Sequence, residues 1–211
     1  MINLVIAYDD NDSSLADYFE SSFSYVSNFT GPLATITNYP IQGLNCTEAH
    51  LAGVVAGFNG QKFCFVGCSH GNCDMLLTDN EVYVSESNCH LFNEALFYSL
   101  GCETAMNLGT KLIENGCSAF VGYYDDSYAT YDQFHDLYIS CETHALKQFL
   151  TTEVSIGEAF DSMIANYDVE IQKMVDANEI LMAMELTHNK DCMAILGNED
   201  LVQGDLHFNL Q

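Results

Sequence analysis

The stretch Phe63-Cys64-Phe65-Val66-Gly67-Cys68 carries no charged side chain, and Ser69-His70-Gly71-Asn72 follows it directly. A short apolar run of this kind is typical of a strand that is buried on both faces, as strands of parallel sheets are. A second such run, 95–100, ends in the turn Gly101-Cys102-Glu103-Thr104. Ligands of open parallel sheets bind outside the carboxyl ends of the strands. The two polar turns therefore mark a candidate site.

The rest of the chain alternates strand-length and helix-length patterns. We expect strands at 2–8, 34–39, 117–123 and 193–196, the second of them stopping at Pro40. Helices are expected at 47–58, 107–115, 131–149 and 156–178, and a hairpin within 75–84 that turns at 78–80. This alternation predicts an α/β fold with a mostly parallel central sheet. No repeat, low-complexity tract or proline-rich linker interrupts it, so residues 1–211 are expected to form a single domain.

The charge of the chain excludes several functions. Thirty acidic residues stand against five lysines, with no arginine, and the net charge is −25. Such a surface repels phosphate backbones and anionic membranes, so we expect no nucleic-acid partner and no membrane association. Without arginine there is also no bidentate clamp for a phosphate or carboxylate, which weighs against kinases and nucleotide-triphosphate sites.

The sequence predicts a cytoplasmic protein. No apolar run approaches the roughly 20 residues of a membrane span, and the first residues lack the basic region of a signal peptide. The nine cysteines are an odd number without a regular framework, so we expect reduced thiols.

His70 and Cys102 form the candidate catalytic pair. Neighbouring parallel strands lie about 4.8 Å apart, so side chains at their ends can face each other across a cleft. A thiol needs a base nearby to become a thiolate near neutral pH, and imidazole is the usual partner. Gly71 leaves room for a substrate carbonyl, and its N–H could donate to a developing oxyanion. The alternative is that Cys102 is one more small buried hydrophobe among nine cysteines.

The sequence segments around these two residues resemble those of the caspase-fold (clan CD) cysteine peptidases, above all the CHAT family and the gingipain-type peptidases. In that group two hydrophobic blocks end in His-Gly and in the nucleophilic Cys, as residues 63–71 and 96–104 do here. The segment SLGCETA is similar to the CHAT consensus S-A-C-E-T-G. The likeness continues through NLGTKLIENGCSAFVGYY (107–124), IGEAF (156–160) and MAILGNED (193–200), and so covers roughly residues 60–200.

The resemblance implies a three-layer α/β/α caspase-like fold and a cysteine endopeptidase with a Cys–His dyad. His70 would activate the thiol or protonate the leaving amine, and Cys102 would form the acyl-enzyme. The N–H groups of Gly71 and Cys102 would hold the oxyanion. Protein substrates are implied, together with a regulatory sensor or effector protein as a second class of partner. Gly101 and Ala105 depart from the usual Ala and Gly around the nucleophile. CHAT domains often lie beside repeat or sensor modules, and we expect none within these 211 residues.

Substrate preference follows from the missing arginine. Caspases hold a P1 aspartate with arginines, whereas gingipain-, separase- and metacaspase-like relatives hold a basic P1 side chain with an acid. Cleavage after Lys or Arg is therefore expected. Asp9, Asp10 and Asp12 follow the first strand, and Asp125 and Asp126 follow the 117–123 strand. Of these acids we expect Asp10, Asp125 and Asp126 to bind the P1 side chain, with Asp10 and Asp125 ranked first. The competing interpretation is that they are solvated loop acids.

Two further interpretations stay open, and a metal is not expected. Cys64, Cys68, His70, Cys73, Cys89 and His90 crowd one stretch, but the spacing lacks the second half of a zinc site, so we expect no metal and no cofactor. A catalytically silent caspase-fold module that binds a partner through its acidic surface is the first alternative. An α/β ligand-binding or redox protein is the second, although no C-x-x-C motif supports it.

Overall fold

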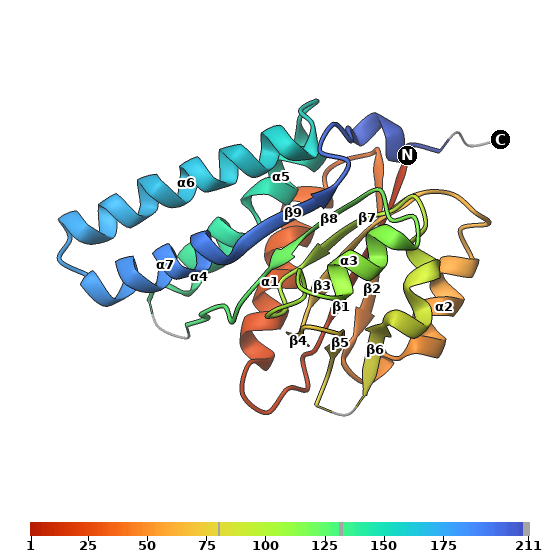
Figure 1. The fold of residues 1–211 in the computed structure, drawn as a ribbon, viewed down its shortest axis with the longest axis horizontal. Helices are drawn as coiled ribbons and strands as arrows, with labels where there is room; N and C mark the ends of the chain where they lie inside the picture. The colour runs from red at the N-terminus through yellow and green to blue at the C-terminus, as the bar shows by residue number, and fades with distance from the viewer. Residues whose placement is uncertain (80, 131–132, 209–211) are drawn as a thin grey trace.

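A six-stranded sheet forms the centre of the computed structural model, which describes residues 1–79, 81–130 and 133–208 (Figure 1). The strand order is β2-β1-β3-β7-β8-β9, and only the pairing of β9 with β8 is antiparallel. The strands are β1 (Ile2–Tyr8), β2 (Ile36–Gln42), β3 (Phe63–Cys68), β7 (Leu96–Ser99), β8 (Ala119–Tyr123) and β9 (Met193–Gly197).

Two hydrophobic clusters cover the two faces of the sheet. In β1, Leu4 and Ile6 belong to one cluster while Val5 and Ala7 belong to the other, because successive side chains of a strand point to opposite faces. Helices on the first face are α1 (Ala16–Thr30), α4 (His135–Glu142), α5 (His144–Thr151), α6 (Ile156–Asp176) and α7 (Ile180–Cys192). The expected three-layer α/β/α architecture with a mostly parallel sheet is confirmed.

The second face carries the shorter elements. These are α2 (Glu48–Ala56), α3 (Leu108–Glu114), the 3₁₀ helix η2 (Glu86–Phe92) and a small antiparallel sheet of β4 (His70–Asn72), β5 (Met75–Leu77) and β6 (Val82–Ser85). Two more 3₁₀ turns, η1 (Gly43–Asn45) and η3 (Gln203–Leu206), complete the described elements. The hairpin expected within 75–84 is confirmed as β5 and β6, and position 80 of its turn lies outside the described residues. Because β4 follows β3 directly, the small sheet fixes His70 at the carboxyl edge of the large one.

Two sequence predictions were wrong in extent, and one helix was missed. The second strand does not stop at Pro40 but runs to Gln42, since β2 is an edge strand and the missing N–H of a proline can face away from the sheet. The helix expected at 131–149 is two helices that meet at Thr143, and its first two positions lie outside the described residues. Helix α7 was not anticipated at all. Its polar residues hide the helical period, yet Leu186 and Asn189 on it are buried.

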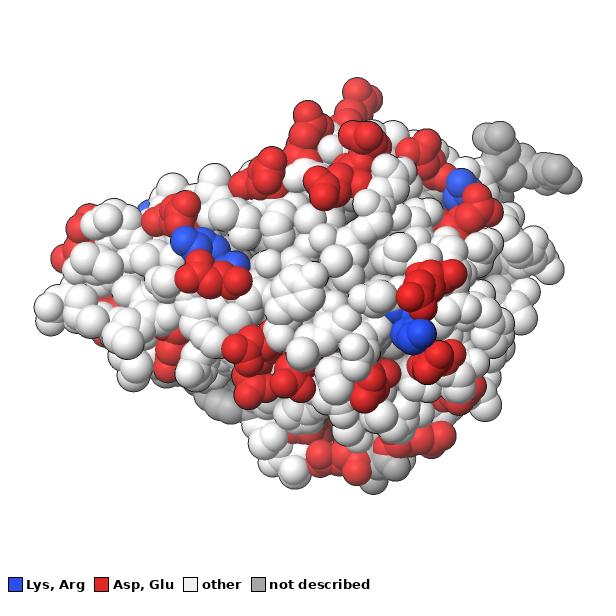
Figure 2. Space-filling model, viewed as in Figure 1, with Lys and Arg blue, Asp and Glu red and all other residues white. Residues whose placement is uncertain are grey.

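Acidic side chains spread over the visible face of the molecule, with few lysines between them (Figure 2). Within the described part of the chain, none of the helices combines the length and the apolar character that crossing a membrane requires. Helices α6 and α7 lie side by side and project beyond the sheet (Figure 1).

Candidate active site

A buried network of hydroxyl groups holds the turn that carries Cys102. The Ser99 hydroxyl at the end of β7 accepts hydrogen bonds from Gly101 N–H at 3.1 Å and from the Thr104 hydroxyl at 2.9 Å. The Thr104 hydroxyl also lies 3.0 Å from the Gly101 carbonyl. Glu103, directly after the cysteine, has the left-handed φ of +57° that most side chains avoid. The turn is therefore a sharp, specifically braced one.

Cys102 is half-buried beneath the loop that follows β8. Its Sγ accepts a hydrogen bond from Ser127 N–H at 3.3 Å and lies 3.6 Å from the Ser127 hydroxyl. The same loop accepts a hydrogen bond from Glu103 N–H through the Asp125 carbonyl at 3.1 Å. The sulfur is thus held between the turn after β7 and the loop after β8, and it keeps contact with solvent.

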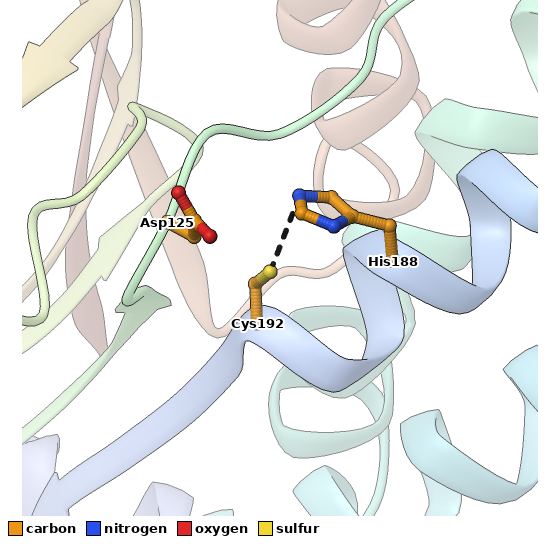
Figure 3. A group of neighbouring side chains, drawn as sticks. All are labelled: Asp125, His188 and Cys192. Carbon is orange, nitrogen blue, oxygen red and sulfur yellow. Dashed lines mark hydrogen bonds between the residues drawn. The ribbon is translucent and has the colours of Figure 1, made fainter.

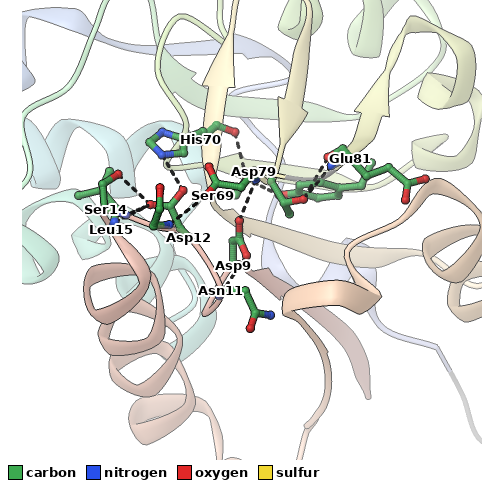
Figure 4. Close-up of polar contacts among 12 residues, drawn as sticks. Asp9, Asn11, Asp12, Ser14, Leu15, Ser69, His70, Asp79 and Glu81 are labelled. Atoms are coloured by element: carbon green, nitrogen blue, oxygen red, sulfur yellow. Dashed lines mark hydrogen bonds and ion pairs between the residues drawn. The ribbon is translucent and has the colours of Figure 1, made fainter.

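His70 is fixed by a buried carboxylate. Its Nε2 lies 2.9 Å from Oδ2 of Asp12, whose side chain is fully buried (Figure 4). The ring also packs edge-on against Phe19 of α1, with 5.5 Å between ring centroids. With Nε2 engaged by Asp12, Nδ1 is the nitrogen that remains for chemistry.

Asp12 is held as an anion by the start of the loop that enters α1. Its Oδ1 accepts hydrogen bonds from the N–H groups of Ser14 and Leu15 and from the Ser14 hydroxyl, at 2.8, 2.5 and 2.9 Å. Burial acts to raise the pKa of Asp12, but these hydrogen bonds and the His70 charge outweigh it and leave the pKa below its usual value. The carboxylate is therefore a permanent negative partner for the imidazole.

A second acid ties this loop to the small sheet. Asp9 accepts hydrogen bonds from Asn11 N–H at 3.2 Å and from Asp79 N–H at 3.3 Å, and the Asp79 carboxylate accepts one from Ser13 N–H at 2.9 Å (Figure 4). Burial raises the pKa of Asp9. The loop that presents Asp12 is thereby fixed relative to the strand that presents His70.

His70 and Cys102 line one pocket, as the sequence led us to expect. The pocket lies between β3, β7, α1 and the loop after β8, and its volume is about 30 Å³. The lining residues are Leu15, Tyr18, Phe19, Ser69, His70, Leu100, Cys102, Ser127, Tyr128 and Ala129. This volume holds little more than a water molecule. The pocket is therefore too small for an amino-acid side chain unless the loop that carries Ser127 moves.

The three acids predicted for substrate binding lie in two different places. Asp10 is turned toward β2, where its carboxylate accepts a hydrogen bond from the Gln42 amide, and it does not line the pocket. Asp125 and Asp126 are exposed on the loop that covers Cys102. Asp12, which sequence reasoning grouped with Asp10 but did not select, is the acid that reaches His70. The sequence signal that could have identified Asp12 is its position directly before Ser13-Ser14-Leu15. A short acid at such a position commonly accepts hydrogen bonds from backbone N–H groups at the start of a helix.

Most of the cysteines that the sequence offers as zinc ligands lie in the hydrophobic core. Cys64 and Cys68 are fully buried in β3, and Cys89 is fully buried in η2. Burial raises the pKa of Cys64 beyond its usual range and that of Cys89 to about 11. These thiols act as small apolar side chains.

A different group of potential metal-binding side chains lies beside the candidate site. Asp125 on the loop after β8 approaches His188 and Cys192 of α7, and one ligand atom from each lies within 4.8 Å of the others (Figure 3). The sequence alone indicated no role for His188 and Cys192, since helix α7 itself went unrecognised.

Two solved structures share the fold of this chain, and one of them is a cysteine proteinase. The crystal structure of the Arg-specific cysteine proteinase gingipain R superposes with a TM-score of 0.62 at 10% identity, over 95% of this chain and 47% of that one. The Saccharomyces cerevisiae separase–securin complex gives a TM-score of 0.56 at 13% identity, over 93% of this chain and 12% of that one. The chain thus spans about half of gingipain R. No protein-family model and no curated protein sequence matches it.

These superpositions define the class of the fold. At this level of identity they establish architecture and leave activity to be argued from the site. The chain has a caspase-like fold, which it shares with gingipain R and with separase.

Proposed function

We propose that the protein is a cysteine endopeptidase in which Cys102 is the nucleophile, His70 the general base and acid, and Asp12 the residue that orients His70. The observation that carries the proposal is the shared pocket: the thiol and the imidazole stand at the ends of neighbouring parallel strands, and a buried carboxylate holds the far nitrogen of the ring. A nucleophile, a base and a group that orients the base are the parts of covalent acyl transfer.

The proposed reaction uses the two ring nitrogens separately. Nδ1 of His70 takes the thiol proton, and the sulfur attacks the scissile carbonyl carbon to give a tetrahedral intermediate. The imidazolium that forms is stabilised by Asp12 and returns its proton to the leaving amine as the C–N bond breaks. Water, deprotonated by the same imidazole, then hydrolyses the thioester and frees Cys102.

The oxyanion would be held by the N–H groups of Gly71 and Cys102. The Gly71 backbone lies against the Cys102 turn, since a Cβ on Gly71 would come within 2.8 Å of the Cys102 carbonyl oxygen. Only a glycine allows the two backbones to come so close. Removing one preorganised oxyanion-hole donor costs about 10²–10³ in kcat in acyl-transfer enzymes.

Cleavage after a basic residue is the proposed specificity. Asp125 and Asp126 are exposed beside Cys102 and carry the only acidic side chains of its covering loop within residues 124–130. The likeness to an Arg-specific cysteine proteinase agrees with this choice. The CHAT-like sequence around Cys102 adds a protein substrate and a regulatory sensor or effector protein as partners.

A thiol-reactive probe tests the proposal. A peptidyl acyloxymethyl ketone with lysine at P1 should label the wild-type protein once, at Cys102. Cys102→Ala and His70→Ala should each abolish labelling and peptide cleavage, because removing one member of a jointly acting pair costs nearly as much as removing both.

Cys73→Ala is the matched control for the probe experiment. Cys73 is the other partly exposed cysteine within the described residues, and its thiol donates to the Asp74 carboxylate at 3.4 Å. This variant should label and cleave like wild type. Wild-type cleavage by Cys102→Ala, with the circular dichroism spectrum unchanged, would refute the mechanism.

A further inference from the structure

The side chains of Asp125, His188 and Cys192 converge next to the active site. His188 and Cys192 are four residues apart on α7, so both project from the same face of the helix. Asp125 comes from the loop after β8 and meets them from the other side (Figure 3). Within residues 1–79, 81–130 and 133–208, no other three side chains of His, Cys, Asp or Glu bring their donor atoms this close.

The distances suit a tetrahedral metal ion. Zn²⁺ binds thiolate at about 2.3 Å and imidazole or carboxylate at about 2.0–2.2 Å, which places its ligand atoms roughly 3.3–3.6 Å apart. Cys192 Sγ already lies 3.4 Å from His188 Nε2. All three donor atoms fall within 4.8 Å of one another, so the exposed Asp125 side chain needs to shift by only about 1 Å to complete a three-ligand site.

The backbone around these donors is already fixed. Tyr124 N–H donates to the Cys192 carbonyl at 2.8 Å, and the Asn189 side chain pairs with both the N–H and the carbonyl of Tyr128 at 2.7 and 2.8 Å. These bonds hold the loop to α7 on both sides of Asp125. A site whose ligands are held in place beforehand binds its metal without ordering the chain.

We propose that Asp125, His188 and Cys192 bind a zinc-type divalent metal ion that links the loop covering Cys102 to helix α7. Thiolate and imidazole together select zinc or cobalt over calcium and magnesium, which prefer oxygen ligands. A water molecule or the Asp126 carbonyl, 2.7 Å from His188 Nε2, supplies the fourth ligand. The strongly negative surface raises the local concentration of cations.

Metal binding releases one proton from the protein. Cys192 loses its thiol proton to solvent and becomes the thiolate ligand. In the metal-free arrangement His188 Nε2–H donates to the Asp126 carbonyl, and this proton moves to Nδ1 so that the Nε2 lone pair faces the metal. With thiolate and carboxylate both bound, the ion is neutralised. Asp125 then no longer offers its charge to a cationic substrate, so the metal-bound form leaves that role to Asp126.

Cobalt titration of the Cys102→Ala protein tests the site independently of peptidase activity. This background removes the proposed nucleophile as a rival metal ligand. We expect one equivalent of Co²⁺ to produce a thiolate-to-cobalt band in the near ultraviolet and the intense visible bands of four-coordinate cobalt. One equivalent of Zn²⁺ should displace it and raise the melting temperature.

Single substitutions on the same background identify the ligands. His188→Gln and Cys192→Ser should abolish the cobalt spectrum, and Asp125→Asn should weaken binding at least tenfold. Cys73→Ser, which removes a partly exposed thiol outside the group, should leave the titration unchanged. Should Cys192→Ser unfold the helix, the cobalt spectrum of His188→Gln alone decides whether these residues are the ligands.

Two results would overturn the metal site. One is a Cys102→Ala protein that shows no thiolate-to-cobalt band. The other is a band that persists in His188→Gln. Neither bears on the peptidase proposal, which the labelling of Cys102 decides.

Discussion

Gly71 and Gly101 pack backbone against backbone at the junction of the two turns that carry His70 and Cys102. A Cβ built on Gly101 would lie 3.0 Å from Gly71 Cα and 3.1 Å from Gly71 N. A Cβ built on Gly71 would lie 3.0 Å from the Gly101 carbonyl carbon. The two glycines thus set the separation between the proposed base and the proposed nucleophile. The Gly101 that departs from the usual CHAT alanine is one half of this contact.

Gly71→Ala should therefore abolish the proposed peptidase activity. The new methyl meets backbone atoms of Gly101 and Cys102, which cannot swing aside as a flexible side chain would. We expect probe labelling of Cys102 to fall at least a hundredfold and the free energy of unfolding to fall by about 1–3 kcal/mol. Urea denaturation and labelling kinetics measure the two effects.

Gly53→Ala is the matched control. Gly53 lies inside α2, and no heavy atom stands within 4 Å of the position its Cβ would take. An alanine there should leave labelling unchanged and stabilise the protein by about 0.5–1 kcal/mol, since alanine is the better helix former. Equal labelling by Gly71→Ala and Gly53→Ala would show that the close approach does not position the two side chains.

Asp12→Asn tests the orientation of His70. Asparagine keeps the Oδ1 acceptor for the N–H groups of Ser14 and Leu15 but loses the charge that faces His70 Nε2. We expect kcat for a peptide substrate to fall roughly 10²–10⁴-fold, with KM nearly unchanged, because the ring loses the partner that fixes its tautomer. Stopped-flow cleavage assays give both constants.

The pH dependence separates this positioning role from a structural one. The pKa of Asp12 is depressed, so its contribution to stability is present above the ordinary aspartate pKa and is lost as the pH falls through the lower folded value. Near neutral pH the wild-type Asp12 is charged, and Asp12→Asn should remove this loss of stability at acid pH while kcat stays low at neutral pH. Asp10→Asn should leave both kcat and the pH dependence of stability unchanged, since Asp10 faces Gln42.

The P1 residue of the substrate is tested with peptides that differ only at that position, as Arg, Lys, Asp and Leu. Arg and Lys should be cleaved fastest. Removing one member of a close ion pair that is partly dehydrated costs about 2–5 kcal/mol, enough to determine selectivity. Faster cleavage of the Asp or Leu peptide would contradict the proposed specificity.

Substitution of the loop acids identifies the residue that recognises P1. Asp125→Asn or Asp126→Asn should lose the preference for a basic P1 side chain and still label at Cys102. Assays contain a chelator, so that Asp125 stays available to the substrate.

The sequence predicted the elements whose pattern is local, and it missed what depends on contacts between distant segments. The runs at 63–68 and 96–99 are apolar on both faces, so their burial and their polar ends could be read directly. Asp12 and Asp10 look alike in sequence, and only the packing of α1 against β3 turns one toward His70. Helix α7 could not be recognised from its residues because it buries Asn189, whose amide pairs with the backbone of Tyr128.

A buried glutamate behind the pocket makes stability depend on pH. Glu142 at the end of α4 is enclosed by tyrosines: the Tyr18 hydroxyl donates to its Oε1 at 3.1 Å and the Tyr123 hydroxyl to its Oε2 at 3.4 Å. Burial raises the pKa of Glu142 to about 8, although both hydrogen bonds act to lower it. The folded protein therefore keeps a proton that the unfolded chain gives up above about pH 4.5.

Stability should accordingly fall as the pH rises from about 5 toward 8. Across that window the folded state holds one proton more than the unfolded state, so the free energy of unfolding decreases by up to about 1.4 kcal/mol per pH unit from this group. Glu142→Gln keeps a neutral side chain of the same shape and should remove that part of the slope. The stability of the variant relative to that of wild type should therefore be higher at pH 7.5 than at pH 5.5. Urea denaturation at several pH values, with the wild-type slope subtracted, isolates the effect.

Glu185→Gln is the matched control and should keep the wild-type slope. Glu185 is half-buried, and it also accepts a hydrogen bond from a tyrosine, Tyr138, at 2.6 Å. Identical slopes for wild type and Glu142→Gln would mean that Glu142 is charged in the folded protein, and that the tyrosine hydroxyls compensate for its burial.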